Sequence, residues 1–357
     1  MVDRVLVISE AGVNHNGNRD AAFELVEAAA GAGADAVKFQ VFHTENLITD
    51  IAEKAEYQKE TTDKEETQFS MLKRLELSHD IFRELAVYCE KIGIRFIATA
   101  FDSDSLAFLS LDLGLPVLKI PSGEITNGPL LLEHARTGRD LIVSTGMSTL
   151  EEVRDALAIL AFGLTKQSGG PTYESARMAF ESTVGKDRLK AKVTLLHCTS
   201  EYPAPIEDIN LRAMETMRKE FNIDVGYSDH SDGLVVPIAA VSLGATVIEK
   251  HFTLDKLGEG PDHRASIEPS ELKILVQNIR ITETIIGNGE KVVQGSEKGN
   301  RELVRKSVVA KTTIKKGEKF SLDNITVKRP GSGRNPMEFW NILGEKASRN
   351  FQRDDIV

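Results

Sequence analysis

The chain has few cysteines and no long apolar run. Cys89 and Cys198 are its two cysteines among 357 residues. They are too few for a disulfide framework and lack the spacing of a metal site, which suits a reducing cytoplasm. No stretch approaches the roughly 18 apolar residues of a membrane helix, and the apolar run in the opening MVDRVLVISEAG is far too short for a signal peptide. These absences predict a soluble, cytoplasmic protein with no membrane partner.

The chain also has fewer positively than negatively charged residues. Lysine and arginine number 44 against 54 aspartates and glutamates, so the net charge is −10. This balance argues against nucleic acid or an anionic membrane surface as a partner. It does not exclude a small anionic substrate, because a local cluster of lysines can outweigh a distant acidic surface. With 41% hydrophobic residues, the chain is long enough for one large domain and a small one.

Eight short runs of β-branched and apolar residues punctuate the first part of the chain. Continuous runs of this kind are typical of parallel strands that are covered on both faces. They lie at residues 5–11, 36–42, 94–101, 117–122, 141–146, 192–199, 224–230 and 246–252. Between and after them come segments with helical spacing, several of which end on glycine: 21–34, 78–93, 128–138, 149–162, 211–222, 234–245 and 268–289.

This alternation predicts an α/β fold, a (β/α)8 TIM barrel over residues 1–287, since such barrels usually have about 250 residues. A doubly wound open sheet is the alternative, but it rarely needs eight strands, and no GxGxxG follows the first strand.

Two connections are long. Residues 43–80 follow the second strand, on the catalytic rim, and can cover a substrate; residues 160–191 precede the sixth strand and are expected on the far face.

The pattern changes beyond the barrel. Residues 288–302 are polar and predict a linker, and residues 303–357 alternate short strands with KKGE and DN turns, which predicts a small β-rich domain. A module of this size is marginal alone, so we expect it to dock against a barrel. We expect the PMEFW stretch, with the single Trp340, to form its core.

Polar residues gather at the carboxyl ends of the predicted strands, where barrels carry their active sites. A purely structural barrel would not need polar groups at all eight endings. In chain order they are Glu10, Lys38, Gln40, Thr99, Lys119, Ser122, Glu124, Ser144, Thr145, His197, Thr199, Ser200, Tyr202, Ser228, Asp229, His230, Glu249 and His251.

Two lysines on separate strands indicate an anion site. Lys38 and Lys119 can be rim lysines that extend to solvent, but each has serine or threonine at neighbouring strand ends, and ammonium groups with directed hydroxyl donors are typical of phosphate or carboxylate recognition.

The two histidines that end successive strands indicate a cation site. Singly, His230 and His251 are more often satisfied core or rim residues than ligands. Together they can converge on one divalent ion, with Glu10 approaching from the first strand. Two imidazoles and a carboxylate suit manganese better than magnesium. His197 lies deeper in its strand, and we expect a structural hydrogen bond there.

Several motifs together resemble the sialic acid synthases (N-acetylneuraminate synthases), a family that includes the legionaminic acid synthases. They are EAGVNHNG, VKFQVF, KIPSGE, STGMST, HCTSEYP, GYSDH, IEKHFTLD and GPDH, and KKGEKFSLDNITVKRPGSG resembles the family's antifreeze-like (SAF) domain. The resemblance implies condensation of phosphoenolpyruvate with an open-chain N-acylated mannosamine-type sugar, giving a nonulosonic acid and phosphate by C–O cleavage. It also implies a divalent metal, most often Mn²⁺ with Mg²⁺ or Co²⁺ possible, and a domain-swapped homodimer.

The resemblance assigns roles by position. It makes His230 and His251 metal ligands and Glu10 the acid/base candidate. It places Lys38, Thr99, Lys119, Ser122, Ser144 and Ser200 around phosphoenolpyruvate, and Gln40, Glu124, Tyr202 and Asp262 near the sugar and the reacting centre. Ser200 stands where some members carry Asn. Arg329, in KRPG, would hold the N-acyl group in the partner's site.

The substrate expected from these motifs is N-acetylmannosamine, giving N-acetylneuraminate. A legionaminic acid synthase using 2,4-diacetamido-2,4,6-trideoxymannose is the near alternative, and a barrel that condenses phosphoenolpyruvate with aldose phosphates is a more distant one. An ice-binding module would be a different class, but the charged C-terminal domain argues against it.

Overall fold

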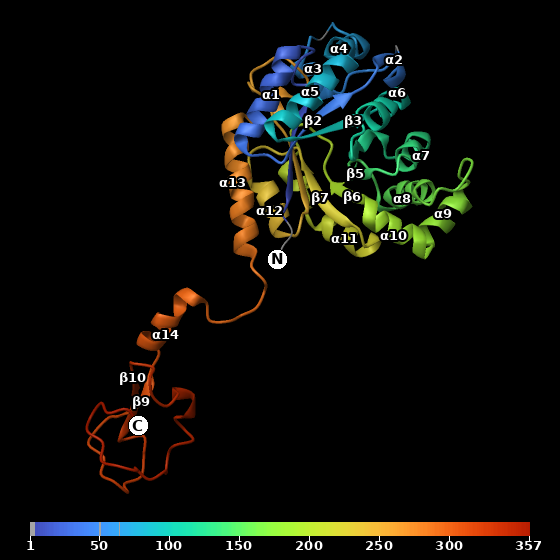
Figure 1. Ribbon diagram of the computed structural model, residues 1–357. Helices are drawn as coiled ribbons and strands as arrows, with labels where there is room; N and C mark the ends of the chain where they lie inside the picture. Colours follow the sequence, from blue (N-terminus) through green and yellow to red (C-terminus); the bar gives the residue numbers. More distant parts are fainter. Residues whose placement is uncertain (1–3, 50, 64) are drawn as a thin grey trace. The chain divides into compact units, whose positions relative to one another are not determined.

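The computed structural model describes residues 4–49, 51–63 and 65–357 (Figure 1). The chain divides into two compact units, with the boundary between Asn288 and Gly289. Each unit is described by itself.

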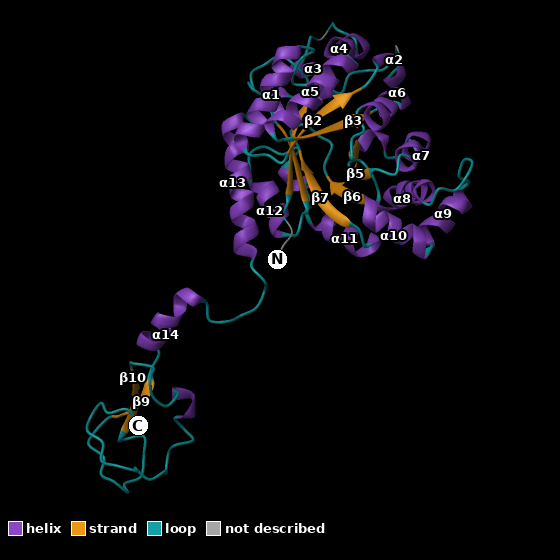
Figure 2. Ribbon diagram, viewed as in Figure 1, coloured by secondary structure: helices purple, strands orange, loops and turns teal. Residues whose placement is uncertain are grey.

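The first unit is a closed barrel of eight parallel strands in sequence order (Figure 2). The strands are β1 (Leu6–Gly12), β2 (Ala36–Val41), β3 (Arg95–Ala100), β4 (Val117–Ile120), β5 (Asp140–Ser144), β6 (Val193–His197), β7 (Asp224–Asp229) and β8 (Val247–His251). β8 closes the barrel against β1, with Glu10 opposite His251. The predicted TIM barrel and its eight strands are confirmed.

Helices surround the barrel and bury their apolar faces against the outer side of the strands. All seven predicted helices are present: α1 (Arg19–Ala32), α5 (His79–Ile92), α7 (Gly128–Arg136), α8 (Leu150–Leu164), α11 (Arg212–Phe221), α12 (Val235–Ser242) and α13 (Pro269–Ile286). Their ends follow local chemistry. The side chain of Asn18 accepts hydrogen bonds from the first turn of α1, and Gly33 ends that helix at φ 83°, a conformation that favours glycine.

One connection between strands was not predicted to be helical. Between β3 and β4 the chain forms α6 (Ser103–Ala107), which runs into a π-helical turn at Phe108–Asp112. Each piece is about one turn long, and such short pieces carry too little apolar periodicity to be recognised in the sequence.

The long connection after β2 forms three short helices, α2 (Thr44–Leu47), α3 (Glu56–Thr61) and α4 (Gln68–Leu75). Met71 and Leu75 of α4 pack with Val13 and Phe42 in a small cluster separate from the main core. This cluster attaches the insertion to the segments that leave β1 and β2, at the carboxyl end of the barrel.

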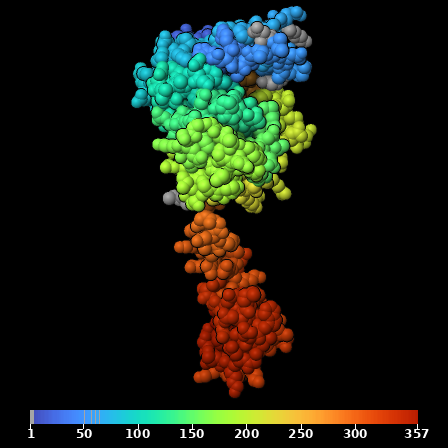
Figure 3. Space-filling model, turned by 90° about the vertical axis from the view of Figure 1, so that its right-hand side faces the viewer, coloured from blue at the N-terminus to red at the C-terminus, as the bar shows by residue number. Residues whose placement is uncertain are grey.

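The second long connection extends α8 and adds α9 (Tyr173–Glu181) and α10 (Thr183–Lys192). Both added helices pack on α8. In Figure 3 the yellow-green part of the barrel unit, which includes these helices, faces the viewer. α10 leads directly into β6, and Lys192 pairs with Asp140 at the start of β5 at 2.7 Å. The insertion therefore reaches the amino ends of these strands, in agreement with the predicted far-face position.

Period-two alternation divides the barrel interior into an apolar layer and a polar layer. The apolar layer is a buried cluster of Ile8, Ala36, Ile97, Ile142, Leu196 and Val247. Two residues further along the same strands, on the same face, stand Glu10, Lys38, Thr99, Ser144, Cys198 and Glu249. The apolar layer therefore plugs the barrel beneath the polar layer.

Gly226 is the residue of β7 that lies at the level of the apolar layer, opposite Leu196 of β6. A Cβ atom there would lie 2.5 Å from the carbonyl oxygen of Val247 and 2.7 Å from Leu196 Cδ2, so the space that a side chain would need is already filled.

The second unit has a small core of its own. α14 (Lys298–Val304) begins in the predicted linker and ends two residues beyond it, and β9 (Ser307–Ala310) pairs antiparallel with β10 (Ile325–Lys328). The expectation that Trp340 belongs to the core is wrong, since Trp340 is 70% and Met337 79% exposed. Phe339 of the same stretch does pack against the core, which is built from Val308, Ala310, Ile314, Phe320, Ile325, Ile342, Ala347 and Phe351.

Two further expectations concern the whole chain. Cys89 and Cys198 are buried free thiols, in agreement with the predicted absence of a disulfide framework. Among the helices that the structure describes, none is long and apolar enough to span a lipid bilayer.

Gly226→Ala is expected to lower the free energy of unfolding by about 1–3 kcal/mol, because the new methyl group overpacks the barrel against the Val247 backbone. Urea unfolding followed by circular dichroism measures the change. Gly31→Ala is the matched control, because no atom lies within 4 Å of its added Cβ and alanine is the better helix former. Equal stability of Gly226→Ala and the wild type would contradict the packing of this layer.

Candidate active site

A cavity of about 370 Å³ opens at the carboxyl ends of the barrel strands. Twelve of the fourteen predicted site residues line it: Glu10, Lys38, Gln40, Thr99, Lys119, Ser122, Ser144, Ser200, Tyr202, His230, His251 and Asp262. The insertion after β2 also lines the cavity, through Ala55, Gln58, Met71, Leu72 and Leu75. The prediction that this insertion lies on the catalytic rim is therefore confirmed.

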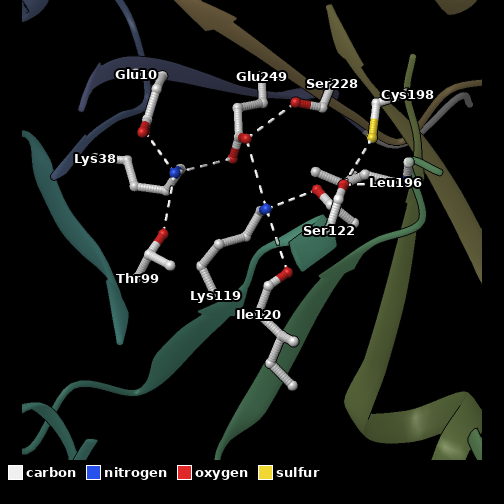
Figure 4. Close-up of polar contacts among 12 residues, drawn as sticks. Glu10, Lys38, Thr99, Lys119, Ile120, Ser122, Leu196, Cys198, Ser228 and Glu249 are labelled. Carbon is white, nitrogen blue, oxygen red and sulfur yellow. Dashed lines mark hydrogen bonds and ion pairs between the residues drawn. The ribbon is translucent and has the colours of Figure 1, made fainter. Parts of the chain in front are cut away.

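Lys38 lies between two carboxylates on the cavity floor (Figure 4). Its Nζ atom is 2.5 Å from Glu10 Oε2 and 3.8 Å from Glu249 Oε2, and it donates a hydrogen bond to Thr99 Oγ1 at 3.1 Å. Burial by itself would lower the pKa of Lys38, but the carboxylates of Glu10 and Glu249 outweigh it and raise that pKa above its ordinary value. Lys38 is therefore a fixed cation.

Lys119 is the second buried ammonium group. Its Nζ atom donates to Ser144 Oγ at 2.6 Å and lies 3.6 Å from Glu249 Oε1. Burial lowers the pKa of Lys119, and the attraction of Glu249 offsets this only in part. Lys119 thus has less negative charge around it than Lys38. The attraction between Lys119 and an incoming anion is therefore less offset by neighbouring carboxylates.

Glu249 holds the two lysines together. Its carboxylate contacts both ammonium groups and accepts a hydrogen bond from Ser228 Oγ at 3.0 Å. Burial would raise the pKa of Glu249, but Lys119 and Lys38 outweigh it, so the pKa is lowered. One carboxylate thus reduces the repulsion between two cations in a site with little solvent.

The cavity contains more carboxyl groups than ammonium groups. Burial raises the pKa of Glu10 despite its contact with Lys38. Burial, reinforced by Glu10, raises the pKa of Asp262 to about 7. These two groups therefore accept a proton more readily than ordinary carboxylates, which is the property of a general base that operates near neutral pH.

The two predicted metal-binding histidines meet above this layer. The ring centroids of His230 and His251 are 5.6 Å apart. His230 Nδ1 lies 2.7 Å from the carbonyl oxygen of Thr199, to which it donates, so Nε2 is the unprotonated nitrogen; it faces the hydroxyl of Tyr202 at 3.2 Å. His251 Nδ1 is buried without a hydrogen-bond partner among the described residues.

Both imidazoles are suited to bind a metal. Burial lowers the pKa of His230 to about 4 and that of His251 well below its ordinary value, so both are neutral at pH 7 and have a lone pair available. In the described part of the chain, no three histidine, cysteine or acidic side chains form a closed metal cluster. The pair therefore fits a catalytic site completed by substrate or water better than a structural one.

A buried ion pair behind the cavity wall holds the histidine-bearing segments. Lys250 lies between two cavity-lining residues of β8, so its side chain points outward. Its Nζ atom is 2.7 Å from Asp229 Oδ2 and also donates to the Ser231 carbonyl, while Asp229 Oδ1 accepts from the backbone and hydroxyl of Ser231. These contacts flank His230 and His251 and fix the backbone that carries both imidazoles.

Two predicted site residues do not line the cavity. Glu124 follows β4 in a short 3-10 turn, and its Oε2 accepts from Asn127 at 2.7 Å. Arg329 belongs to the second unit. Their proposed roles remain predictions. His197 hydrogen-bonds the carbonyl of Ile209 through Nε2 at 2.8 Å, as a structural role requires.

Two central residues, Glu249 and Ser228, are absent from the predicted set. The signal exists in the sequence, because Glu249 stands two positions before His251 and Ser228 two before His230, so each pair is expected on one face. Both stand among the polar strand-end residues noted in the sequence, but only the histidines were assigned a role there. The apolar residues contributed by the insertion carry no comparable signal.

TIM-barrel enzymes bind small substrates in cavities at the carboxyl ends of their strands. The two lysines of this cavity favour an anionic substrate. Comparison with known proteins gives the family. The NeuB family model matches residues 25–291 and the SAF domain model matches residues 305–357. The chain belongs to the NeuB family, the sialic acid synthase family. These are enzymes that use phosphoenolpyruvate and an acylated amino sugar to make nonulosonic acids.

Named relatives cover nearly the whole chain. It is 45% identical to the N,N'-diacetyllegionaminic acid synthase of Campylobacter jejuni, over 99% of both chains, and 46% identical to that of Legionella pneumophila, over 96% of this chain and 90% of the relative. A crystal structure of N-acetylneuraminic acid synthetase from Leptospira borgpetersenii, in complex with citrate, is 32% identical with a TM-score of 0.68, covering 84% of this chain and 90% of that one.

Glu249→Gln is expected to lower kcat/KM for phosphoenolpyruvate by about 100-fold or more. The amide keeps the hydrogen bond to Ser228 but leaves two buried ammonium groups without their shared counter-charge, which further lowers the pKa of Lys119. Phosphate release in the presence of the sugar measures the effect.

Glu133→Gln on the exposed face of α7 removes the same charge away from the cavity and serves as the control. Wild-type kcat/KM in a folded Glu249→Gln protein would remove Glu249 from the site.

Proposed function

We propose that the chain condenses phosphoenolpyruvate with 2,4-diacetamido-2,4,6-trideoxymannose, forming N,N'-diacetyllegionaminic acid and phosphate. Nearly full-length identity of 45–46% to two named legionaminic acid synthases supports this substrate, against 32% to the N-acetylneuraminic acid synthetase. The comparisons thus favour the alternative sugar over the N-acetylmannosamine expected from the motifs. The observation in the structure that carries the reaction type is the pair of buried lysines, joined by Glu249, beside two neutral imidazoles.

Phosphoenolpyruvate binds at the lysine side of the cavity. The ammonium groups of Lys38 and Lys119 supply fixed positive charge, and the nearby hydroxyls of Thr99, Ser122 and Ser144 supply directed donors. Water has been excluded from these groups already, so their attraction for an anion is stronger than in solution.

The reaction is an attack of the enol carbon on the aldehyde carbon of the open-chain sugar. A carbon–carbon bond forms as the π bond of the aldehyde breaks, and the aldehyde oxygen receives that electron pair and takes up a proton to become a hydroxyl group. Positive charge develops at the adjacent carbon of phosphoenolpyruvate, and water adds there. In this proposal Glu10 stabilises that charge and accepts a proton from the water. The tetrahedral intermediate then loses phosphate by cleavage of the carbon–oxygen bond, and Lys38 and Lys119 stabilise the departing charge.

His230 and His251 would hold a divalent metal, and Mn²⁺ suits two imidazoles better than Mg²⁺, which prefers oxygen ligands. When bound there, it supplies Lewis-acid polarisation of the sugar's carbonyl oxygen. The protein contributes two neutral, buried nitrogens, and the contacts of Thr199 and of the Lys250–Asp229 pair hold them in position.

The remaining parts of the proposal concern assembly and the sugar site. We place Gln40, Glu124, Tyr202 and Asp262 at the sugar, and propose a domain-swapped cytoplasmic homodimer in which Arg329 contacts the N-acyl group in the partner's site. The exposed Trp340 and Met337 support a covered position for the SAF domain in that dimer, because large apolar side chains on a surface favour association.

The substrate assignment predicts a preference that one assay measures. With phosphoenolpyruvate and Mn²⁺, the purified protein should release phosphate with kcat/KM at least about 10-fold higher for the diacetamido sugar than for N-acetylmannosamine, the scale on which pockets discriminate related groups. Reactions without sugar are the control for simple hydrolysis of phosphoenolpyruvate. A preference for N-acetylmannosamine would contradict the assignment.

The metal assignment predicts that chelation abolishes phosphate release and that Mn²⁺ restores it. In the double variant His230→Ala, His251→Ala, activity should fall by about 100-fold or more and should not return with added Mn²⁺. His43→Ala, outside the cavity lining, should respond to chelation and Mn²⁺ like the wild type. Wild-type turnover by the folded double variant without added metal would exclude the assignment.

A further inference from the structure

The cavity has a charged side and an apolar side, and the proposed reaction uses only the first. The apolar side is built by Val13, Met71, Leu72, Leu75 and Phe101. Three of these five come from α4, in the insertion after β2. Met71 and Leu75 are fully buried, whereas Leu72 is half-buried. Of the three α4 side chains that line the cavity, Leu72 is therefore the one with surface left for a ligand to cover.

This wall is larger than attachment of the insertion requires. Val13, Phe42, Met71 and Leu75 form a buried cluster that by itself attaches the insertion. Leu72 and Phe101 extend that cluster toward the cavity, where a side chain facing only bound water would gain more from being polar. An apolar surface that lines a substrate cavity indicates an apolar part of the substrate.

The orientation of the sugar follows from the proposed reaction. The aldehyde carbon, C1, must lie at the charged floor, where phosphoenolpyruvate meets Lys38, Lys119 and the histidines. In an open chain, C6 is the carbon farthest from C1. It therefore lies toward the mouth of the cavity, beyond the carboxyl ends of β1 to β3, where Val13, Phe101 and the insertion line the cavity.

We propose that Leu72, supported by Met71, Leu75, Val13 and Phe101, forms the subsite for the C6 methyl group and makes the enzyme select 6-deoxy sugars. The proposal rests on the proposed function and names the residues that decide its substrate class. A methyl group is buried against the wall with a gain in free energy, whereas a hydroxymethyl group loses its hydrogen bonds to water and finds no polar partner among these five side chains.

The test uses two sugars that differ by one oxygen atom. They are 2,4-diacetamido-2,4,6-trideoxymannose and its 6-hydroxy analogue, and the measured quantity is the ratio of their kcat/KM values in the phosphate-release assay. The wild type should prefer the 6-deoxy sugar by about 10- to 100-fold, which is the range expected when an apolar pocket meets an added hydroxyl group.

Substitutions at one position identify the wall. Leu72→Asn places an amide at the subsite and should lower the ratio by about 10-fold, mainly by improving use of the 6-hydroxy sugar. Leu72→Met keeps an apolar wall and should keep the ratio. Ile51→Asn makes a comparable change on the same insertion at a side chain that is 89% exposed, and should leave the ratio unchanged. If Leu72→Asn does not fold, Leu72→Ala, which removes most of the wall, should also lower the ratio.

The outcomes separate this proposal from the one it rests on. If neither diacetamido sugar is used, the proposed function fails and the subsite with it. If both sugars are used equally well by the wild type, or if a folded Leu72→Asn protein keeps the wild-type ratio, the function stands and the methyl subsite is overturned.

Discussion

The contact of Glu249 with both Lys38 and Lys119 is the interaction on which the rest of the site depends. Two ammonium groups buried at the mouth of one barrel repel each other and have lost their hydration, and a single carboxylate between them makes this arrangement tolerable. With Glu10 and Asp262, the described lining of the cavity has three carboxyl groups and two lysines. Burial therefore raises the pKa values of Glu10 and Asp262. An anion entering this cavity meets cations that are already desolvated and positioned, which is the condition for strong electrostatic stabilisation of a reacting phosphate ester.

The barrel makes this arrangement possible through its two interior layers. The cluster around Ile8, Ile142 and Leu196 fills the barrel below the site, so the charged layer rests on a packed base and not on water. Outside the strands, the Lys250–Asp229 pair holds the segments that carry His230 and His251. Each functional group is thus supported from beneath or behind by contacts that do no chemistry themselves, and the backbone positions of the imidazoles follow from those contacts.

The insertion after β2 adds an apolar part to the cavity lining, which we propose distinguishes substrates. The charged floor suits the common partner, phosphoenolpyruvate, while in the proposed arrangement Leu72 and the apolar side chains around it face the variable partner, the sugar. Common chemistry is thus carried by rigid strands and specificity by a segment outside the barrel. This division allows one barrel to serve relatives that act on different acylated sugars, because the insertion can change without disturbing Lys38, Lys119 or Glu249.

Much of the molecule was predictable because its determinants are local. The eight apolar runs, the glycine-ended helices and the polar residues at strand ends follow from period and propensity, and the motifs around Lys38, Lys119, His230 and His251 indicate the family. Other features depend on long-range packing. Trp340 lies in an apolar stretch yet is exposed, Glu124 bonds Asn127 outside the cavity lining, and Leu72 faces the cavity through the fold of α4. The sequence by itself determined the alternation of strands and helices and the chemistry at each strand end. Only the tertiary structure decided which charges share a carboxylate and which apolar side chains line the cavity, because burial and closure bring together residues that lie far apart along the chain.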